Sequence, residues 1–395
     1  MSASPRNRRA AAPHLPELDT FRGLAAILMV LNHAGVQLLE PAAAASGPAA
    51  AWVFLGSFAP VLFFAATGFG MGLSITGPVR PLRSVLDKVL LLVVADMLSY
   101  WRGGQWWGLD FFGFIALSML LVALIRMTPR PLLAAAVVAT AVVVLRYGLG
   151  PLFKSSIPTS GPLAWVFGVW PQEPISYPAA PWLFYPAAGF LLAGLFARHG
   201  HEMSRRVVLR CWTLAAGALL VTAVAAFVIW RGSGSFHRWS SVGVGFFVLS
   251  LSVLIVAGMF CVGVTRWLPA LARLMALGGV SSFVVVPVHY GLIETAKSVG
   301  LAGLPPAAFA MIAGLLTVLA LALSQRIGSW LGESGGPSRI DPKWIAGAVA
   351  AALLLTITTI ALANVDSRSA FVASVLAQLC LAALLARSRA KGRVQ

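Results

Sequence analysis

Charge is what this sequence has least of. Only 10% of its 395 residues are Asp, Glu, Lys or Arg, whereas soluble domains carry about 25% charged residues. Hydrophobic residues make up 59% of the chain, and the mean hydropathy is +0.87. This composition excludes a soluble globular protein. It predicts an all-α fold, a polytopic membrane helix bundle embedded in a lipid bilayer.

Cysteines and acidic residues are also scarce. The three cysteines lie inside or beside apolar runs without metal-ligand spacing, so they indicate neither a disulfide framework nor a metal site. Twelve acidic residues stand against 29 basic ones, which gives a net charge of +17. Because the basic residues lie between apolar segments, they are typical of topology signals and lipid head-group contacts, and no nucleic-acid partner is expected.

Apolar segments of membrane-spanning length recur along the chain. A helix needs about 20 apolar residues to cross the hydrocarbon core. If the amino terminus is cytoplasmic, 21 of the 29 basic residues fall in inside segments, seven in outside segments and Arg22 in the membrane. This bias predicts about 12 transmembrane helices with the amino and carboxyl termini both cytoplasmic. The predicted spans are residues 20–38, 50–76, 85–101, 109–126, 131–147, 180–197, 208–230, 241–264, 275–297, 304–327, 343–363 and 370–386.

The chain divides into three expected regions. Residues 1–17 form a basic cytoplasmic arm, residues 18–330 the main membrane domain, and residues 331–395 two further transmembrane helices with a basic cytoplasmic tail. The first apolar run is longer than a signal-peptide core and contains Arg22 and His33. We therefore expect it to remain as a helix and not to be cleaved.

The longest segment without a predicted span, residues 148–180, is rich in aromatic residues and proline. The predicted topology places it outside. An aromatic belt at the membrane interface is the favoured interpretation. The alternative is a lid or re-entrant loop whose rings, such as Trp165 and Trp170, stack on sugars.

The stretch from Leu18 to Gly35, LDTFRGLAAILMVLNHAG, is an apolar helix that carries two groups which hydrocarbon excludes. Arg22 and His33 are eleven residues apart, which is about 20° past three full turns, so both side chains lie on one helix face. The rise between them is about 16 Å, roughly half a bilayer core. A histidine at that depth is a candidate functional residue.

Four stretches resemble the membrane acyltransferase superfamily, which includes the acyltransferase 3 family and the heparan-alpha-glucosaminide N-acetyltransferase-like proteins. The first is FRGLAAILMVLNH, with its Arg, ten residues and His. The others follow in the family's order: APVLFFAATGFGMGLS (59–74), YPAAPWLFYPAAGFLLAGLF (177–196) and LGGVSSFVVVPVHYGLI (277–293). The resemblance implies that residues 18–330 are an acyltransferase-like domain.

Two branches of the superfamily share these features. Two features, the LDTFRGL opening and the Pro-Trp helix at Trp182, are typical of the heparan-type branch. Two others, the Arg-to-His spacing and the late histidine, are typical of the acyltransferase 3 family. The third helix departs from the acyltransferase 3 pattern, because Arg83 and Lys88 are not a basic pair followed by proline.

The residues of the predicted helices suggest catalytic roles. Acyl transfer needs a base for the acceptor proton, and a neutral imidazole suits this, so His33 is the first candidate. His289 lies at a similar depth and either assists His33, orients the acceptor or packs between helices; Pro287, two residues earlier, predicts a kink. Asp96 is the one carboxylate well inside a predicted span, and it either orients a histidine or pairs with a basic residue.

Five further residues are candidates for substrate or acyl-CoA binding. Arg22 either binds acyl-CoA phosphates or is an arginine that snorkels to the membrane surface, and the two interpretations are equally supported. Ser282 lies seven residues before His289, on nearly the same helix face. The remaining candidates are Arg83, Lys88 and Trp182.

The resemblance implies an acyltransferase with acyl-CoA, most simply acetyl-CoA, as donor substrate and a hydroxyl or amine of a glycan or glycolipid near the outer face as acceptor. The expected location is a bacterial inner (cytoplasmic) membrane. One alternative is a multi-pass transporter or flippase, which predicts internal repeats and broken helices in corresponding halves. The other is a non-catalytic membrane scaffold, in which replacing His33 changes stability and not turnover.

Overall fold

The computed structural model describes residues 15–45, 47–73, 75, 82–99, 109–153, 162–167, 176–199, 205–233, 243–280, 282–330, 342–362 and 367–394. Within these ranges the protein is all-α, as predicted, and its β-structure is limited to isolated bridges, such as the one between Leu39 and Leu304. Residues 1–14 of the predicted amino-terminal arm and Trp170 lie outside the described residues, and α1 begins within the arm at Pro16.

Helices cover every predicted span. They are α1 (Pro16–Leu38), α2 (Pro41–Ala45), α3 (Gly47–Gly56), α4 (Ala59–Gly72), α5 (Leu82–Ser99), α6 (Phe111–Met127), α7 (Pro131–Val143), the π-helix η2 (Val144–Leu149), α8 (Gly150–Phe153), α9 (Pro162–Phe167), α10 (Ala179–Trp182), α11 (Phe184–His199), α12 (Arg205–Ser233), α13 (Val244–Trp267), α14 (Pro269–Val280), α15 (Ser282–Ser298), α16 (Pro306–Trp330), α17 (Pro342–Leu362) and α18 (Ser367–Val394).

Several helices have the length and composition to cross a membrane. Among the described residues, five spans meet these criteria on their own: Pro16–Leu38, Gly47–Gly72, Pro131–Leu149, Val244–Trp267 and Pro306–Trp330. The pair α14–α15 is a sixth if it is counted as one bent span. Shorter apolar helices accompany them. The protein is therefore an integral membrane helix bundle. The total of twelve spans stays a prediction.

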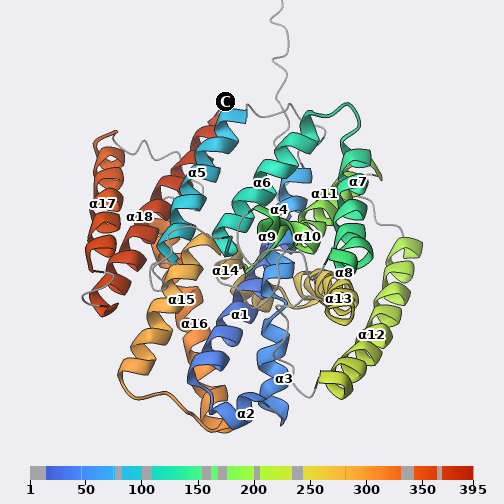
Figure 1. The fold of residues 1–395 in the computed structure, drawn as a ribbon, viewed down its shortest axis with the longest axis horizontal. Helices are drawn as coiled ribbons and strands as arrows, with labels where there is room; N and C mark the ends of the chain where they lie inside the picture. The colour runs from blue at the N-terminus through green and yellow to red at the C-terminus, as the bar shows by residue number, and fades with distance from the viewer. Residues whose placement is uncertain are drawn as a thin grey trace, which may run out of the picture.

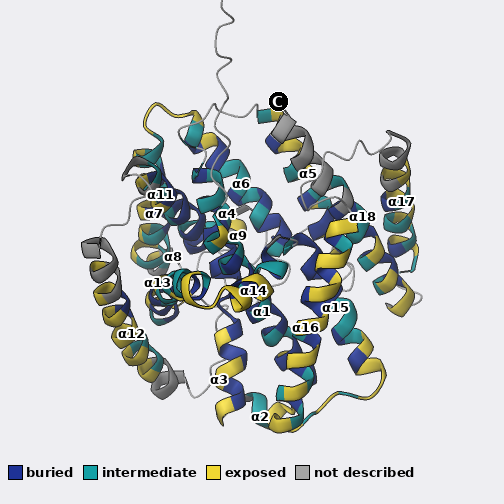
Figure 2. Ribbon diagram, turned by 180° about the vertical axis from the view of Figure 1, so that it is seen from behind, coloured by how far each residue is buried: buried dark blue, intermediate teal, exposed yellow. Residues whose placement is uncertain are grey.

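The outer faces of the bundle are apolar. Figure 2 shows exposed residues along α12, α16 and α3. On α12 these include Leu214, Leu220, Val224 and Phe227, all more than half exposed. In water such a face would be an exposed apolar patch, whereas in a bilayer it faces acyl chains of similar polarity.

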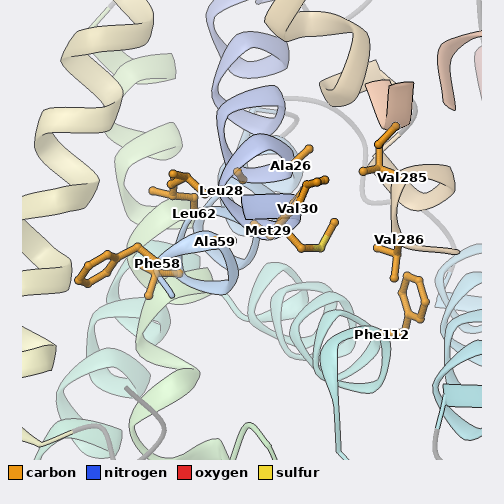
Figure 3. Close-up of a cluster of buried hydrophobic side chains, with 14 of the residues drawn as sticks. Ala26, Leu28, Met29, Val30, Phe58, Ala59, Leu62, Phe112, Val285 and Val286 are labelled. Atoms are coloured by element: carbon orange, nitrogen blue, oxygen red, sulfur yellow. The ribbon is translucent and has the colours of Figure 1, made fainter. Parts of the chain in front are cut away.

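Helix α1 lies at the centre of the bundle, with α12 and α17 at opposite edges (Figure 1). It packs against α3, α4, α13, α14, α15 and α16. Its sequence favours a helix from the start, because Pro16 occupies the first turn and Glu17 and Asp19 are acidic residues near the helix amino terminus. Figure 3 shows the apolar core around it, where Met29 and Val30 of α1 lie between Leu62 of α4 and Val286 of α15.

Glycines set the closest helix contacts. A Cβ atom at Gly68 of α4 would lie 1.9 Å from the carbonyl oxygen of Pro186, and one at Gly189 of α11 would lie 2.1 Å from that of Ala65. On α1, a Cβ at Gly23 would lie 1.8 Å from the carbonyl oxygen of Met275. The small-residue packing of α4 on α11 and of α1 on α14 therefore requires glycine at these positions.

The predicted span 275–297 is not one straight helix. It is divided into α14 and α15, which are bent by 83° between Gly279 and Ser282. We expected the kink at Pro287, but α15 continues through that proline. The bend between α14 and α15 lies where packing is close: a Cβ at Gly279 would lie 1.9 Å from the carbonyl oxygen of Asp19, so α14 ends against the start of α1. The kink at Pro287 stays a prediction.

The carboxyl-terminal helices join the main bundle. Helix α18 packs on α17, α5 and α15, and Ser374 Oγ donates a hydrogen bond to the carbonyl oxygen of Leu98 at 2.7 Å. In Figure 1 the carboxyl end lies on the side opposite to α2 and the turn between α15 and α16. The division at residue 331 and the cytoplasmic location of both termini stay predictions.

Candidate active site

The end of α1 is fixed to the turn that follows α15. The backbone N–H of Leu304 donates to the carbonyl oxygen of Leu38 at 2.7 Å, and the N–H of Glu40 donates to the carbonyl oxygen of Leu304 at 3.0 Å. On another face of α1, Asn32 Nδ2 donates to the carbonyl oxygen of Val53 in α3 at 2.9 Å. These bonds set the register of α1 against α15 close to His33.

His33 and His289 meet inside the bundle. His33 Nδ1 lies 2.8 Å from His289 Nε2, and the two rings are stacked with centroids 5.0 Å apart. His289 is 0% exposed, and its Nδ1 lies 2.9 Å from the carbonyl oxygen of Val285. His33 is half-buried. Of the interpretations left open for His289, direct contact with His33 is the one that the geometry supports.

Tyr290 completes this cluster. Its ring stacks on that of His33 with centroids 4.9 Å apart, and its hydroxyl lies 3.5 Å from His33 Nε2. Sequence reasoning assigned no role to Tyr290, although its position directly after His289 was a signal that it shares the same region of α15. We call His33, His289 and Tyr290 the histidine cluster.

A second aromatic and acidic group adjoins Tyr290. Tyr177 lies in the segment before α10, and its backbone N–H donates to the carbonyl oxygen of Leu109 at 3.1 Å. Burial, followed by the charges of Asp110, Tyr290 and Asp96, raises the pKa of Tyr177 well above its ordinary value. The phenol of Tyr177 therefore stays protonated, as a hydrogen-bond donor in a region that also contains carboxylates.

A polar rim lies where α1 and α15 end. Lys297 Nζ contacts Glu294 Oε1 at 3.2 Å and donates to Gln37 Oε1 at 3.3 Å. Gln37 follows His33 by one helical turn, and Glu294 follows Tyr290 by the same interval. The partly exposed rim and the buried histidines thus share the facing sides of the two helices.

Arg22 lies towards the other end of α1. Its Nη1 is 3.6 Å from Asp19 Oδ1. Its Nη2 lies close to Gly70 of α4, since a Cβ atom added to that glycine would be only 2.6 Å from Nη2. The side chain is 29% exposed. The guanidinium is accordingly held near the start of α1 with part of its surface open to a ligand.

Asp96 lies near the end of α5, and its carboxylate contacts the start of α6. It is 3% exposed, and its Oδ2 accepts a hydrogen bond from the backbone N–H of Asp110 at 3.1 Å. A Cβ at Gly113 would lie 2.4 Å from the same oxygen. A carboxylate in this place stabilises the helix amino terminus. The structure thus gives Asp96 a capping contact, and its predicted histidine-orienting role stays a proposal.

The other predicted binding residues are dispersed. Trp182 is 0% exposed and packs on Phe64, Tyr177 and Tyr185, so it belongs to the aromatic core beside the site. Arg83 is exposed and Lys88 half-buried on α5, and Ser282 is half-buried at the first position of α15. Among the described residues, no group of three His, Cys, Asp or Glu side chains is arranged to hold a metal ion.

The fold and the site together define an integral membrane protein whose helix bundle encloses a pair of histidines. Residues 14–206 match the family described as heparan-alpha-glucosaminide N-acetyltransferase, catalytic. The match confirms the predicted resemblance: this part of the chain is similar to a membrane acetyltransferase catalytic region. No curated protein and no solved structure matches the chain.

The matched range includes some candidate residues and not others. Arg22, His33 and Asp96 lie within it, whereas it ends before α15. The match therefore does not bear on His289 and Tyr290, and it is the fold that brings them to His33.

Proposed function

We propose that this protein is a membrane acyltransferase that moves an acetyl group from acetyl-CoA to a hydroxyl or amine of a glycan or glycolipid. The observation that carries the proposal is the contact between His33 and His289, in a chain whose residues 14–206 are similar to an acetyltransferase catalytic region. A histidine pair in a membrane interior carries a desolvation cost, so it is a candidate functional site by default. Acetyl transfer uses an imidazole directly.

The reaction needs one base and no metal in its simplest form. The acceptor O–H or N–H gives its proton to the imidazole of His33 while its oxygen or nitrogen attacks the thioester carbonyl carbon. The carbon–sulfur bond breaks, and the leaving thiolate takes the proton from His33 to become the free thiol of CoA. His33 ends the cycle in the protonation state in which it began.

The two ends of α1 suit the two substrates. Arg22, about 16 Å from His33 along the helix, is a charged donor for the phosphates of CoA on the side predicted to be cytoplasmic. The polar rim of Gln37, Glu294 and Lys297 lies one turn beyond His33, on the side predicted to be outer. The acceptor enters there, and the expected location is a bacterial inner (cytoplasmic) membrane.

Transfer of radiolabelled acetyl from acetyl-CoA tests the proposal. Membranes that contain wild-type protein, His33→Ala or a control are compared at equal amounts of folded protein. The control is His201→Ala, because this histidine lies in the sequence between the predicted spans 180–197 and 208–230. We expect label in lipid or glycan with wild type and His201→Ala, and none with His33→Ala. Equal labelling by His33→Ala would contradict the role of His33.

Transport is a second candidate, because the bent pair α14–α15 resembles the broken helices of transporters. It predicts uptake or release of substrate by proteoliposomes without acetyl transfer. If a labelled substrate crosses the vesicle membrane chemically unchanged and no acetylated product forms, the result would support transport and contradict the proposed acyltransferase activity.

A further inference from the structure

The contact between His289 and Val285 fixes one proton. A backbone carbonyl oxygen accepts hydrogen bonds and never donates them. Because His289 Nδ1 lies 2.9 Å from the carbonyl oxygen of Val285, that nitrogen carries a hydrogen and donates it. In a neutral imidazole the other ring nitrogen, Nε2, then has a free lone pair.

The contact between the two rings fixes a second proton. His289 Nε2 accepts, so His33 Nδ1, 2.8 Å away, carries the hydrogen and donates it. A neutral His33 then has its free lone pair on Nε2. The hydroxyl of Tyr290 lies 3.5 Å from this nitrogen and is a donor that suits it.

The opposite arrangement requires a buried cation. If His289 donated from both nitrogens it would be an imidazolium, and His33 would lose its free Nε2. Among the described residues, the side chain of His289 contacts the Val285 carbonyl and the rings of His33 and Tyr290, and none of these is a carboxylate. An ion at 0% exposure without a counter-charge is strongly disfavoured.

We propose that His289 is a positioning residue, which holds His33 as the Nδ1–H tautomer and so makes His33 Nε2 the base nitrogen of the site. The inference rests on the proposed function for its catalytic meaning. The order of donors, from His33 to His289 and from His289 to the Val285 carbonyl, follows from the distances and the burial of His289, without reference to activity. A second histidine here does what an orienting carboxylate does in a catalytic triad.

Nitrogen NMR tests the tautomer without reference to activity. The protein is labelled with ¹⁵N-histidine and reconstituted in lipid bilayers, and the signals are assigned with His33→Ala and His289→Ala. We expect His33 to carry its proton on Nδ1 in the wild type and to lose this preference in His289→Leu. A proton on His33 Nε2 in the wild type, or an unchanged His33 in His289→Leu, would overturn the inference.

Kinetics separate positioning from packing. In His289→Gln, the amide oxygen replaces Nε2 as acceptor for His33 Nδ1–H, whereas His289→Leu removes the acceptor. We expect kcat to fall less than about tenfold in His289→Gln and about 10²- to 10⁴-fold in His289→Leu, the range known for orienting partners. Equal losses in both variants, with folded protein confirmed, would contradict positioning.

The two proposals fail in different ways. The Nδ1–H tautomer of His33 without acetyl transfer to any acceptor would contradict the proposed function and leave the tautomer assignment standing. Acetyl transfer with His33 in the Nε2–H tautomer would support the proposed function and contradict the tautomer assignment. If His289→Leu does not fold, the wild-type spectrum and His289→Gln still decide the inference.

Discussion

At the scale of single residues, the site depends on two side chains that are 256 positions apart in the sequence. The sequence indicated that both histidines lie at similar depths in the membrane, because the number of residues from each histidine to the end of its predicted helix gives that depth. It did not indicate that their rings touch, since depth says nothing about which helices are neighbours. The neighbours are decided by packing of α1 on α15 and by the backbone bonds at Leu38 and Leu304.

Tyr290 offers a first prediction. Tyr290→Phe keeps a ring that stacks on His33 and removes the hydroxyl, whose contact at 3.5 Å is long for a hydrogen bond. We expect kcat to change by less than about tenfold, because an oxygen at this distance contributes little net free energy. Steady-state acetyl transfer measures it. A loss as large as that of His33→Ala would instead make the phenol the proton-transfer group.

Arg22 offers a second prediction. If its guanidinium binds the phosphates of CoA, Arg22→Ala raises KM for acetyl-CoA by about tenfold or more, the equivalent of one hydrogen bond to a charged group. Asp19→Asn is the matched control, because it removes the ion pair at 3.6 Å and leaves the guanidinium. An unchanged KM in Arg22→Ala would favour the snorkelling arginine.

At the scale of elements, composition and periodicity predicted helices for every span, but not how α14 and α15 meet. The proline rule pointed to Pro287, and it gave no sign of the bend between Gly279 and Ser282. A rule on single residues cannot anticipate it, because the bend depends on α14 crossing the start of α1 while α15 brings His289 to His33. Asp96 is similar: its depth was apparent from sequence, whereas its contact with the start of α6 required the fold.

The glycine contacts give a prediction at this scale. Gly68→Ala forces a methyl group against the carbonyl oxygen of Pro186, whereas Gly217→Ala on α12 meets nothing within 4 Å. We expect Gly68→Ala to lower the unfolding temperature in detergent and to reduce the yield of folded protein, since overpacking costs about 1–3 kcal/mol. Gly217→Ala should leave stability equal or raise it by up to about 1 kcal/mol. Equal unfolding temperatures for the two variants would contradict the close packing of α4 on α11.

At the scale of the whole molecule, the distribution of basic residues predicts the orientation in the membrane. The 29 basic residues, distributed unevenly between alternate connections, predict cytoplasmic termini. Reporter fusions test this: we expect a fusion after Gln395 to be active only as a cytoplasmic reporter, and one after Gly300, in the turn between α15 and α16, only as an external reporter. Both reporters on the same side would contradict the predicted topology and the separate entry of donor and acceptor.

The central claim is that His33 and His289 act as one catalytic unit. The most direct measurement is a double-mutant cycle of acetyl transfer with wild type, His33→Ala, His289→Leu and the double variant, each at equal folded protein. Residues that act through one another lose activity non-additively, so the account predicts that the double variant is no slower than His33→Ala alone. Losses that multiply, or full activity in His33→Ala, would contradict it.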